Sequence, residues 1–471
     1  MNTTDFKNRR VTVMGLGRFG GGIGVVNFLL QQGARVTLTD LQREGQLKDS
    51  LSKIDVSRLD QLVLGEHRER DFVECDCVVI NPGIVADKNR FIRAAVRAGV
   101  PVTTEINLFW DRCRAKVIIV TGTVGKSTTS SLITHLLKHA GVSCHLGGNI
   151  GISLLSKVET FTEDDWVVLE LSSFQLEYLK PLQPRPNITV VTNFFANHID
   201  WHGDLDSYRT AKQVALNWQT PDGVAVLNAN DPDVRQWKTK GKRIEFGSQA
   251  NHEVDRIEMT PHSYEIKVGS DVEEIPYSAL PARLNLPHQR ANIAAALAAV
   301  LSTQTADPNT IMKGLSSFRP LPHRLELIAD REGIEYINDS KATTPEATMA
   351  ALSSMTRPVV LIAGGKDKRI DVSELCRSIS GHVKAVALIG DTSLLMAFLL
   401  PEYRKGLLYS VHHDLASAYR WCQKQLESGD TLLLSPGCSS DSQFLNYEDR
   451  GNQFRQLVET KTNTCSEQSS H

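Results

Sequence analysis

The sequence has no C-x-x-C pair, no long apolar run and no excess of basic residues. Its eight cysteines are dispersed along 471 residues, which predicts free thiols in a reducing cytoplasm. No apolar stretch approaches the ~20 residues that span a bilayer, and the polar first ten residues predict no secretory signal. The net charge of −2 argues against a nucleic-acid partner.

What is present is the composition of a globular protein, with 41% hydrophobic and 23% charged residues. The length predicts two to four domains. Strand-like and helix-like stretches alternate in three sections, and two prolines mark a break at Phe318–Glu326. We therefore expect three α/β domains, at residues 1–115, 116–320 and 321–471, with a disordered tail from about residue 460.

The most informative stretch is Val117-Ile-Ile-Val-Thr-Gly-Thr-Val-Gly-Lys-Ser-Thr-Thr129. Four β-branched apolar residues predict a buried strand, Gly122 and Gly125 a turn, and the residues after Lys126 a helix. A strand, glycine loop and helix N-terminus together form an anion site. The pattern is the compact T-G-T-x-G-K-[ST] variant of the phosphate loop. In such a loop Lys126 would bind phosphate oxygens, and the hydroxyl of Ser127 or Thr128 would bind magnesium.

A second glycine motif, G-x-G-x-x-G, follows a predicted strand near the N-terminus and is made by Gly15, Gly17 and Gly20. A helix-like stretch to Leu30 and a strand ending at Asp40 complete a dinucleotide-type fingerprint. By itself this pattern favours an NAD-dependent oxidoreductase. The same loop can hold any nucleotide diphosphate, so both interpretations stay open here.

Polar residues end several predicted elements of the middle section. Asn149 lies in a glycine-rich turn at 146–151. Glu170 ends an apolar strand, and its carboxylate could either orient a magnesium ion or lie in solvent. His198, Asp200 and His202 alternate, which leaves a metal site or an ordinary polar loop open. Lys212 lies on a predicted helix and would ordinarily be solvated. Residues 243–286 alternate and predict antiparallel strands.

The third section repeats the α/β pattern, with predicted strands that end in polar or glycine-rich clusters near residues 339, 364 and 436. Strand ends of such sheets are where ligands bind. Taken together, the motifs resemble the Mur ligase family from about residue 10 to 455. The stretches that carry the likeness are T-G-T-V-G-K-S-T, G-G-N-I-G, L-E-L-S-S-F-Q-L-E, N-H-I-D-W-H, Y-R-T-A-K, L-P-H-R-L-E, N-D-S-K-A-T and R-G-N-Q-F.

Within the family, the likeness is greatest to the members that join D-glutamate to UDP-N-acetylmuramoyl-L-alanine. It implies ATP and Mg²⁺ as cofactors, two small-molecule substrates, a cytoplasmic monomer and a role in peptidoglycan synthesis. The residues implied for ATP are Gly122, Thr123, Val124, Gly125, Lys126, Ser127, Thr128, His288, Asn292, Arg324 and Asp339. Those implied for the uridine diphosphate substrate are Gly17, Arg18, Asp40, Gly83 and Asn149.

The resemblance also implies an amino-acid site and a metal site. The amino-acid residues are Lys341, Thr343, Lys368, Ser440 and Tyr447. The magnesium ligands are Ser127, Glu170, His198 and a carbamylated Lys212, and the catalytic residues are Lys126, His198 and Lys212. The sequence departs from the family pattern at Val124, Gln289 and Asp441, and we expect Asp441 to face solvent or to pair with a lysine.

Three other functions are compatible with parts of the sequence. A folylpolyglutamate synthase-type ligase shares the phosphate loop but lacks the N-terminal glycine motif of residues 11–40. An NAD-dependent oxidoreductase fused to a phosphate-loop domain leaves Glu170, His198 and Lys212 without a role. A non-catalytic nucleotide-binding module is disfavoured by the complete set of magnesium and ATP residues.

Overall fold

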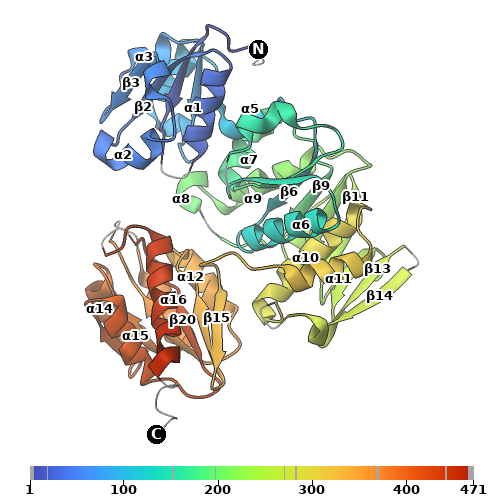
Figure 1. The fold of residues 1–471 in the computed structure, drawn as a ribbon, viewed down its shortest axis with the longest axis vertical. Coiled ribbons are helices and arrows are strands. Elements are labelled where there is room, and N and C mark those ends of the chain that lie inside the picture. Colours follow the sequence, from blue (N-terminus) through green and yellow to red (C-terminus); the bar gives the residue numbers. More distant parts are fainter. Residues whose placement is uncertain are drawn as a thin grey trace. The chain divides into compact units, whose positions relative to one another are not determined.

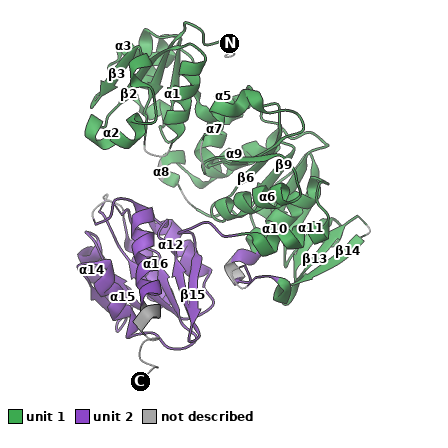
Figure 2. Cartoon of the chain, viewed as in Figure 1, with its two compact units in different colours: residues 1–279, 291–318 green, residues 280–290, 319–471 purple. Residues whose placement is uncertain are grey.

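A computed structural model describes residues 5–17, 20–150, 153–196, 198–269, 271–281, 284–367, 371–440 and 443–464. The side chains of residues 200, 287, 288 and 461–464 are outside the description. The predicted site residues Arg18 and Lys368, the departure Asp441 and the side chain of His288 therefore lie outside it. The chain divides into one unit of residues 1–279 and 291–318 and another of 280–290 and 319–471 (Figure 2).

The first sheet is parallel and has the strand order β3-β2-β1-β4-β5. Its strands are β1 (Arg10–Met14), β2 (Arg35–Asp40), β3 (Gln61–Leu64), β4 (Cys77–Ile80) and β5 (Val102–Thr104). Its helices are α1 (Gly21–Gln31), α2 (Glu44–Leu51), α3 (Arg70–Val73), α4 (Arg90–Arg97) and α5 (Glu105–Trp110). The apolar residues of β1 and β4 are buried. Strands that are covered on both faces need hydrophobic side chains along their length, and the sequences of β1 and β4 show this pattern.

The second sheet has nine strands in the order β14-β13-β12-β11-β10-β9-β6-β8-β7. They are β6 (Lys116–Thr121), β7 (Cys144–Gly148), β8 (Trp166–Glu170), β9 (Ile188–Val191), β10 (Val224–Asn228), β11 (Lys242–Gly247), β12 (Asp255–Met259), β13 (Ser263–Val268) and β14 (Asp271–Pro276). The accompanying helices are α6 (Lys126–His139), α7 (Ser173–Leu179), α8 (Ile199–His202), α9 (Leu205–Asn217), α10 (Pro287–Ser302) and α11 (Pro308–Ser317). Figure 1 shows α6, α10 and α11 beside this sheet.

The third sheet lies in the other unit and has the order β15-β16-β20-β17-β18-β19, with β15 antiparallel to β16 and the remaining pairs parallel. Its strands are β15 (Glu326–Arg331), β16 (Ile334–Asn338), β17 (Val359–Ala363), β18 (Val383–Leu388), β19 (Leu408–Val411) and β20 (Thr431–Leu434). Its helices are α12 (Pro345–Ser353), α13 (Ser373–His382), α14 (Ser393–Tyr403), α15 (Leu415–Gln423) and α16 (Tyr447–Thr464). Figure 1 shows α14, α15 and α16 packed against it.

The predicted fold class, three α/β sheets in succession, is confirmed, whereas the boundaries at residues 115 and 320 stay predictions. The antiparallel prediction for 243–286 is right for β12, β13 and β14 but wrong for β11, which pairs with β12 in parallel. The predicted turn at 146–151 begins later, because Leu146–Gly148 continue β7 beside β8. Helix α16 continues to Thr464, past the residue where the tail was expected to begin.

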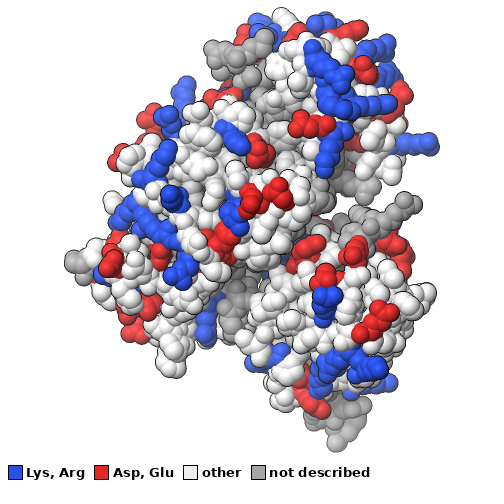
Figure 3. All heavy atoms as spheres, turned by 180° about the vertical axis from the view of Figure 1, so that it is seen from behind, with Lys and Arg blue, Asp and Glu red and all other residues white. Residues whose placement is uncertain are grey.

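Two surface properties complete the description. Among the described residues, no helix is both long and apolar enough to cross a bilayer. On the face shown in Figure 3, acidic and basic side chains are interspersed, in keeping with a net charge close to zero.

Candidate active site

The phosphate loop lies at the carboxyl end of β6, where three neighbouring strands also end. Val120 of β6 pairs with Glu170 of β8, Thr121 with Val191 of β9, and Gly148 of β7 with Glu170. Parallel strands bring their carboxyl ends to one edge of a sheet. This register therefore places the loop, Glu170 and the turn that carries Asn149 side by side.

Both loop glycines occupy positions where a side chain would collide. Gly122 has φ of 138°, and a Cβ added there would lie 2.0 Å from Thr192 Oγ1. Gly125 has φ of 83°, and its added Cβ would lie 2.2 Å from Asn292 Oδ1. Asn292 of α10, expected at the ATP site, therefore touches the loop directly. The left-handed conformation of Gly125 lets α6 start at Lys126 without a side-chain cap on its N-terminus.

Asn193, at the end of β9, shapes the loop and was missed by the sequence analysis. Its side-chain oxygen accepts from the N–H groups of Thr123 at 3.1 Å and Val124 at 2.9 Å. Its side-chain nitrogen donates to Val124 O at 3.1 Å. The signal was its position as a polar residue directly after a buried strand. Val124, which departs from the family pattern, takes part through its backbone, so its side chain is not needed for these bonds.

Two lysines converge on the loop carbonyl of Gly122. Lys126 Nζ donates to Gly122 O at 3.1 Å and to Thr123 O at 2.8 Å, and Lys212 Nζ donates to Gly122 O at 2.7 Å. Lys212 is only 2% exposed, so the expectation of a solvated lysine is wrong. Burial, and then repulsion from Lys126, lowers the pKa of Lys212 well below its ordinary value.

Tyr208 on α9 supports both the loop and Lys212. Its hydroxyl lies 3.2 Å from Thr123 Oγ1, and Lys212 Nζ lies 4.7 Å from the centre of its ring. The side chain is 1% exposed, and burial raises the pKa of Tyr208 to about 12. The ring of Tyr208 therefore packs beside the Lys212 amine, next to the loop.

Ser127 and Glu170 are buried polar residues with atoms that lack a hydrogen-bond partner among the described residues. These atoms are Ser127 Oγ and Glu170 Oε2. Glu170 is 1% exposed, which excludes a solvated acid, while its other oxygen lies 3.5 Å from Asn149 Nδ2. A buried polar atom without a partner costs free energy, of order 1–3 kcal/mol. Hydroxyl and carboxylate oxygens are the donors that Mg²⁺ prefers, so both residues fit that ion.

The segment with His198 lies at the surface of the same unit. His198 is exposed, has φ of 55°, and its ring centre lies 4.8 Å from that of Phe174. His202 Nε2 lies 2.9 Å from Ser173 Oγ. No group of three or more His, Cys, Asp or Glu side chains that could hold a metal occurs among the described residues. The alternating histidines therefore form no preassembled metal cluster there, and a magnesium role for His198 stays a prediction.

The N-terminal glycine turn is organised by Asp40. Its carboxylate accepts from the N–H groups of Leu16 at 2.9 Å, Gly17 at 3.3 Å and Gln42 at 2.8 Å. Asp40 is 7% exposed, and its three hydrogen bonds hold the backbone of the turn in place. Gly83, from the turn after β4, accepts from Trp201 Nε1 of α8 at 3.1 Å. The turn at Gly83 is thereby tied to the segment that begins at His198.

The C-terminal sheet gathers a second group of predicted residues. Asp339 accepts from Ser435 Oγ at 2.7 Å and from Leu325 N at 3.2 Å, and burial raises its pKa to about 7. Lys341 Nζ donates to Tyr447 Oη at 2.8 Å. Arg324 lies beside Asp339, whose pKa its charge lowers in opposition to burial. The structure thus brings Arg324, Asp339, Lys341 and Tyr447 to the end of β16.

Arg450 on α16, the first residue of the R-G-N-Q-F motif, holds this cluster together. It is fully buried and donates to Ser340 Oγ at 3.0 Å, Ser340 O at 2.8 Å and Cys438 O at 3.1 Å. Two residues beyond Cys438 lies Ser440, which is 3% exposed. The Thr343 N–H donates to Lys341 O at 2.9 Å. Arg450 therefore joins the segment with Lys341 and Thr343 to the turn with Ser440.

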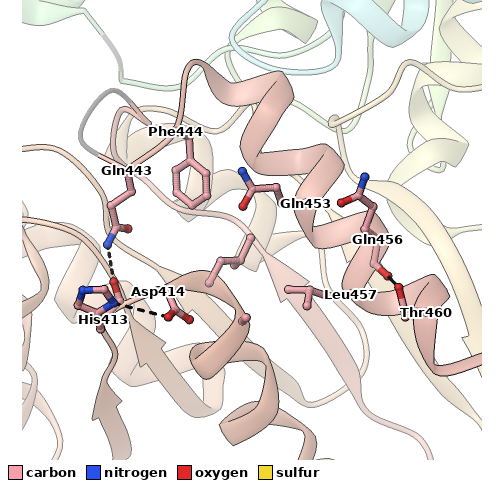
Figure 4. A pocket seen from close by; sticks show the side chains of 10 residues that line it. His413, Asp414, Gln443, Phe444, Gln453, Gln456, Leu457 and Thr460 are labelled. Carbon is pink, nitrogen blue, oxygen red and sulfur yellow. Dashed lines mark hydrogen bonds and ion pairs between the residues drawn. The ribbon is translucent and has the colours of Figure 1, made fainter. Parts of the chain in front are cut away.

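A hollow with a volume of about 850 Å³ lies elsewhere, between the start of α15 and one face of α16 (Figure 4). Its lining includes His413, Asp414, Gln443, Phe444 and Gln453. Gln443 Nε2 donates to His413 O at 2.7 Å, and Asp414 caps α15. None of the predicted site residues lines it, so this hollow adds nothing to the proposed chemistry.

Comparisons with known proteins agree with this arrangement. Three family models match the chain: a Mur ligase MurD-like N-terminal domain at residues 9–104, a Mur ligase middle domain at 120–300, and a Mur ligase glutamate ligase domain at 323–438. A UDP-N-acetylmuramoylalanine--D-glutamate ligase of Roseiflexus sp. (strain RS-1) is 35% identical, across 96% of this chain and 99% of its own length. The enzyme of that name from Pelotomaculum thermopropionicum is also 35% identical, across 96% and 98%.

Solved structures show the same fold at lower identity. The MurF ligase of Thermotoga maritima, in complex with ADP, has a TM-score of 0.57 and 16% identity, and the match covers 98% of this chain and 97% of that one. The UDP-N-acetylmuramate-alanine ligase MurC of the same organism has a TM-score of 0.56 and 19% identity, covering 97% and 100%.

Proposed function

Since this chain belongs to the Mur ligase family, we propose that it is an ATP-dependent ligase that joins D-glutamate to UDP-N-acetylmuramoyl-L-alanine in peptidoglycan precursor synthesis. The observation that carries the chemistry is the edge of the central sheet. There the phosphate loop meets two lysines and the incompletely bonded oxygens of Ser127 and Glu170. This set is suited to ATP phosphates and a divalent cation.

The proposed reaction has two steps. The alanyl carboxylate attacks the γ-phosphorus of ATP, which gives an acyl phosphate and ADP. The amine of D-glutamate then attacks the acyl carbon, which forms the amide and releases phosphate. Lys126, at the first position of α6, supplies positive charge beside the transferring group. We assign the ATP phosphates to Gly122–Thr128 and the adenine and phosphate side to His288 and Asn292. Arg324 and Asp339 are the further ATP-binding residues that we propose.

Magnesium fits Ser127 and Glu170, whose partnerless oxygens lie on neighbouring elements of the same sheet edge. The ion would screen the negative charges that the carboxylate and the ATP phosphates bring together. His198 and a carbamylated Lys212 are the further ligands we propose. Because the pKa of Lys212 is lowered, more of its amine is neutral, and a neutral amine is the form that adds CO₂ and loses a proton to give a carbamate.

Most residues of the two proposed substrate sites come from the N-terminal and C-terminal sheets, and Asn149 follows β7 of the nine-stranded sheet. Gly17, Arg18, Asp40, Gly83 and Asn149 form the site we propose for the uridine diphosphate substrate. Lys341, Thr343, Lys368, Ser440 and Tyr447 form the site we propose for D-glutamate. Two carboxylates require cationic and hydroxyl donors, and the Lys341–Tyr447 pair and the buried Ser440 supply such groups in the described part of this site. We also propose that the protein acts as a cytoplasmic monomer.

The deciding assay measures phosphate release from ATP in the presence of UDP-N-acetylmuramoyl-L-alanine and one amino acid at a time. We expect turnover with D-glutamate and none above background with L-glutamate or L-lysine. A clear preference for L-lysine would show that Asp441 faces the amino-acid site and that the acceptor is wrong.

A matched pair of serines tests the metal assignment. Ser127 and Ser131 lie on the same helix, and both hydroxyls are buried without a described partner. Ser127→Ala should raise the Mg²⁺ concentration needed for half-maximal activity about tenfold, and Ser131→Ala should leave it unchanged. Equal responses of the two variants would remove Ser127 from the metal site.

A further inference from the structure

Two residues with a left-handed backbone flank Arg324. His323 has φ of 63° and Leu325 has φ of 45°. In this region the Cβ of an L-residue lies close to the following carbonyl oxygen, so glycine and asparagine adopt it most readily. Histidine is also enriched there, whereas a bulky residue such as leucine is an outlier. The backbone at Leu325 is therefore strained.

Hydrogen bonds hold the backbone of this segment on both sides. The His323 N–H donates to Glu326 Oε2 at 3.0 Å, and the His323 carbonyl accepts from the Lys341 N–H at 3.1 Å. The Leu325 N–H donates to Asp339 Oδ1 at 3.2 Å. Strained conformations persist where the surrounding structure over-determines them, and these bonds are the constraints that do so here.

The ring of His323 is enclosed by β16 and α16. It is 6% exposed, and its Nδ1 lies 3.0 Å from Nδ2 of the fully buried Asn338. Asn338 Nδ2 also donates to Gly451 O at 3.1 Å. A Cβ added to Gly451 would lie 2.2 Å from His323 Nδ1, so glycine at this place in α16 leaves room for the ring. The start of the segment is thus fixed by its side chain as well as by its backbone.

Arg324, in the middle of this segment, differs from its neighbours. Its half-buried side chain makes no hydrogen bond or ion pair with the residues that the structure describes. A guanidinium carries five N–H donors in a planar fork, which suits the oxygens of a phosphate. The backbone is therefore held firmly at the place where the side chain is left unbonded.

We propose that Leu325 is a positioning residue for ATP: its left-handed conformation, held by Asp339, fixes the direction in which the unbonded Arg324 side chain leaves the backbone. The inference rests on the proposed function, which assigns Arg324 to ATP. Arg324 contacts the nucleotide, and Leu325 acts through it. An arginine that is fixed before binding loses less conformational entropy on binding, so strain at Leu325 raises the affinity for ATP.

Substitutions at Leu325 separate backbone conformation from apolar packing. Leu325 packs, partly buried, against the apolar core of the C-terminal sheet, so packing alone predicts that valine replaces it better than asparagine. Conformation predicts the opposite order, because asparagine adopts the left-handed backbone and a β-branched residue does not.

The measurement is the affinity for ATP, by calorimetry on the full chain. Leu325→Asn should stay within about threefold of the wild type. Leu325→Val should bind ATP about tenfold more weakly, which corresponds to about a tenth of the molecules in the competent conformation. The KM for UDP-N-acetylmuramoyl-L-alanine should stay within about twofold of the wild type in both variants.

A double-mutant cycle shows whether the leucine acts through the arginine. In an Arg324→Ala background, Leu325→Val should not weaken ATP binding further, because the group that it positions is gone. The matched control is Glu332→Val. Glu332 is exposed, has φ of 54° and lies in the turn between β15 and β16, at the opposite end of these strands from Leu325 and Asp339. This control should lower the melting temperature and leave the affinity for ATP unchanged.

A second pair keeps the inference testable if Leu325→Val fails to fold. Leu325→Gly and Leu325→Ala both remove the apolar side chain, but glycine adopts the left-handed backbone readily and alanine does not. The glycine variant should therefore bind ATP at least about threefold more tightly than the alanine variant.

Three results would overturn the inference while leaving the proposed function intact. They are an affinity for ATP in Leu325→Val that equals or exceeds that of Leu325→Asn, equal affinities of the glycine and alanine variants, and additive effects in the double-mutant cycle. A wild type that releases no phosphate from ATP with UDP-N-acetylmuramoyl-L-alanine and D-glutamate would overturn both.

Discussion

The carboxyl edges of the central and C-terminal sheets are built from similar elements but differ in how their polar groups are bonded. At the central edge, Ser127 Oγ and Glu170 Oε2 are buried without a partner among the described residues. At the C-terminal edge, Asp339 is bonded to Ser435, and Arg450 to Ser340 and Cys438. One edge leaves bonding capacity for a ligand, while the other is already cross-linked by its own side chains.

The difference separates two ways of preparing a site. Partnerless buried oxygens lower the stability of the fold and raise its affinity for a cation that can bond them. A cross-linked cluster stabilises the fold and fixes the positions of neighbouring residues, here Lys341 and Ser440. Mutations at the central edge should therefore affect activity more than stability, and mutations at the C-terminal edge should affect both.

The largest effect is expected for Lys126→Ala. The lysine donates to two loop carbonyls and is not part of the apolar core, so circular dichroism and the melting temperature should stay close to those of the wild type. Phosphate release should fall at least about 1,000-fold, because the positive charge at the transferring phosphoryl group is lost. A variant that keeps turnover within about tenfold of wild type would refute the phosphate-loop assignment.

Arg450→Ala should give the largest loss of stability. Removing the fully buried guanidinium leaves Ser340 O and Cys438 O without their partner and creates a cavity. We expect the free energy of unfolding to fall by about 3 kcal/mol, measured by urea denaturation. Ser127→Ala is the contrasting variant and should not lower the free energy of unfolding, since it loses no described bond and removes a partnerless buried hydroxyl. Similar losses in the two variants would remove the distinction between the two edges.

Lys212→Ala tests whether the buried lysine acts through an added carboxylate. Activity should fall about 100-fold, and a short carboxylate such as acetate should restore part of it by supplying oxygens for magnesium. Tyr208→Phe is the control for position, since it keeps the ring beneath Lys212 and removes only the hydroxyl next to Thr123. Full activity of Lys212→Ala without any addition would show that the lysine has no role in catalysis.

The smallest effect concerns Asp339 and pH. Its folded pKa of about 7 is above the ordinary value of 3.8, so its contribution to stability is fully present below pH 3.8 and is lost as pH rises through 7. The free energy of unfolding of Asp339→Asn minus that of the wild type should therefore increase by about 2 kcal/mol from about pH 5 to about pH 8. Asp330→Asn, an exposed acid on β15, should show no such gain. If the two variants changed equally with pH, Asp339 would not be the group responsible for the pH dependence of stability.

Local patterns were enough for the parts of the site that are continuous in sequence. The phosphate loop, the strand that ends at Glu170 and the helix that carries Lys212 were predicted from apolar runs, glycines and polar strand ends, and the structure has all three. The pairing of β11 with β12 was not predictable, because alternation of side chains is compatible with either strand direction.

The sequence by itself determined the succession of three α/β sheets, since buried parallel strands and glycine loops depend on residues that are close in the chain. Only the tertiary structure decided the environment of single charged groups. Lys212 is buried because α9 places it against the phosphate loop, where its Nζ donates to Gly122 O. The burial and the hydrogen-bond partners of a charged side chain depend on residues far apart in sequence. The local sequence therefore cannot distinguish a solvated acid or lysine from a buried one.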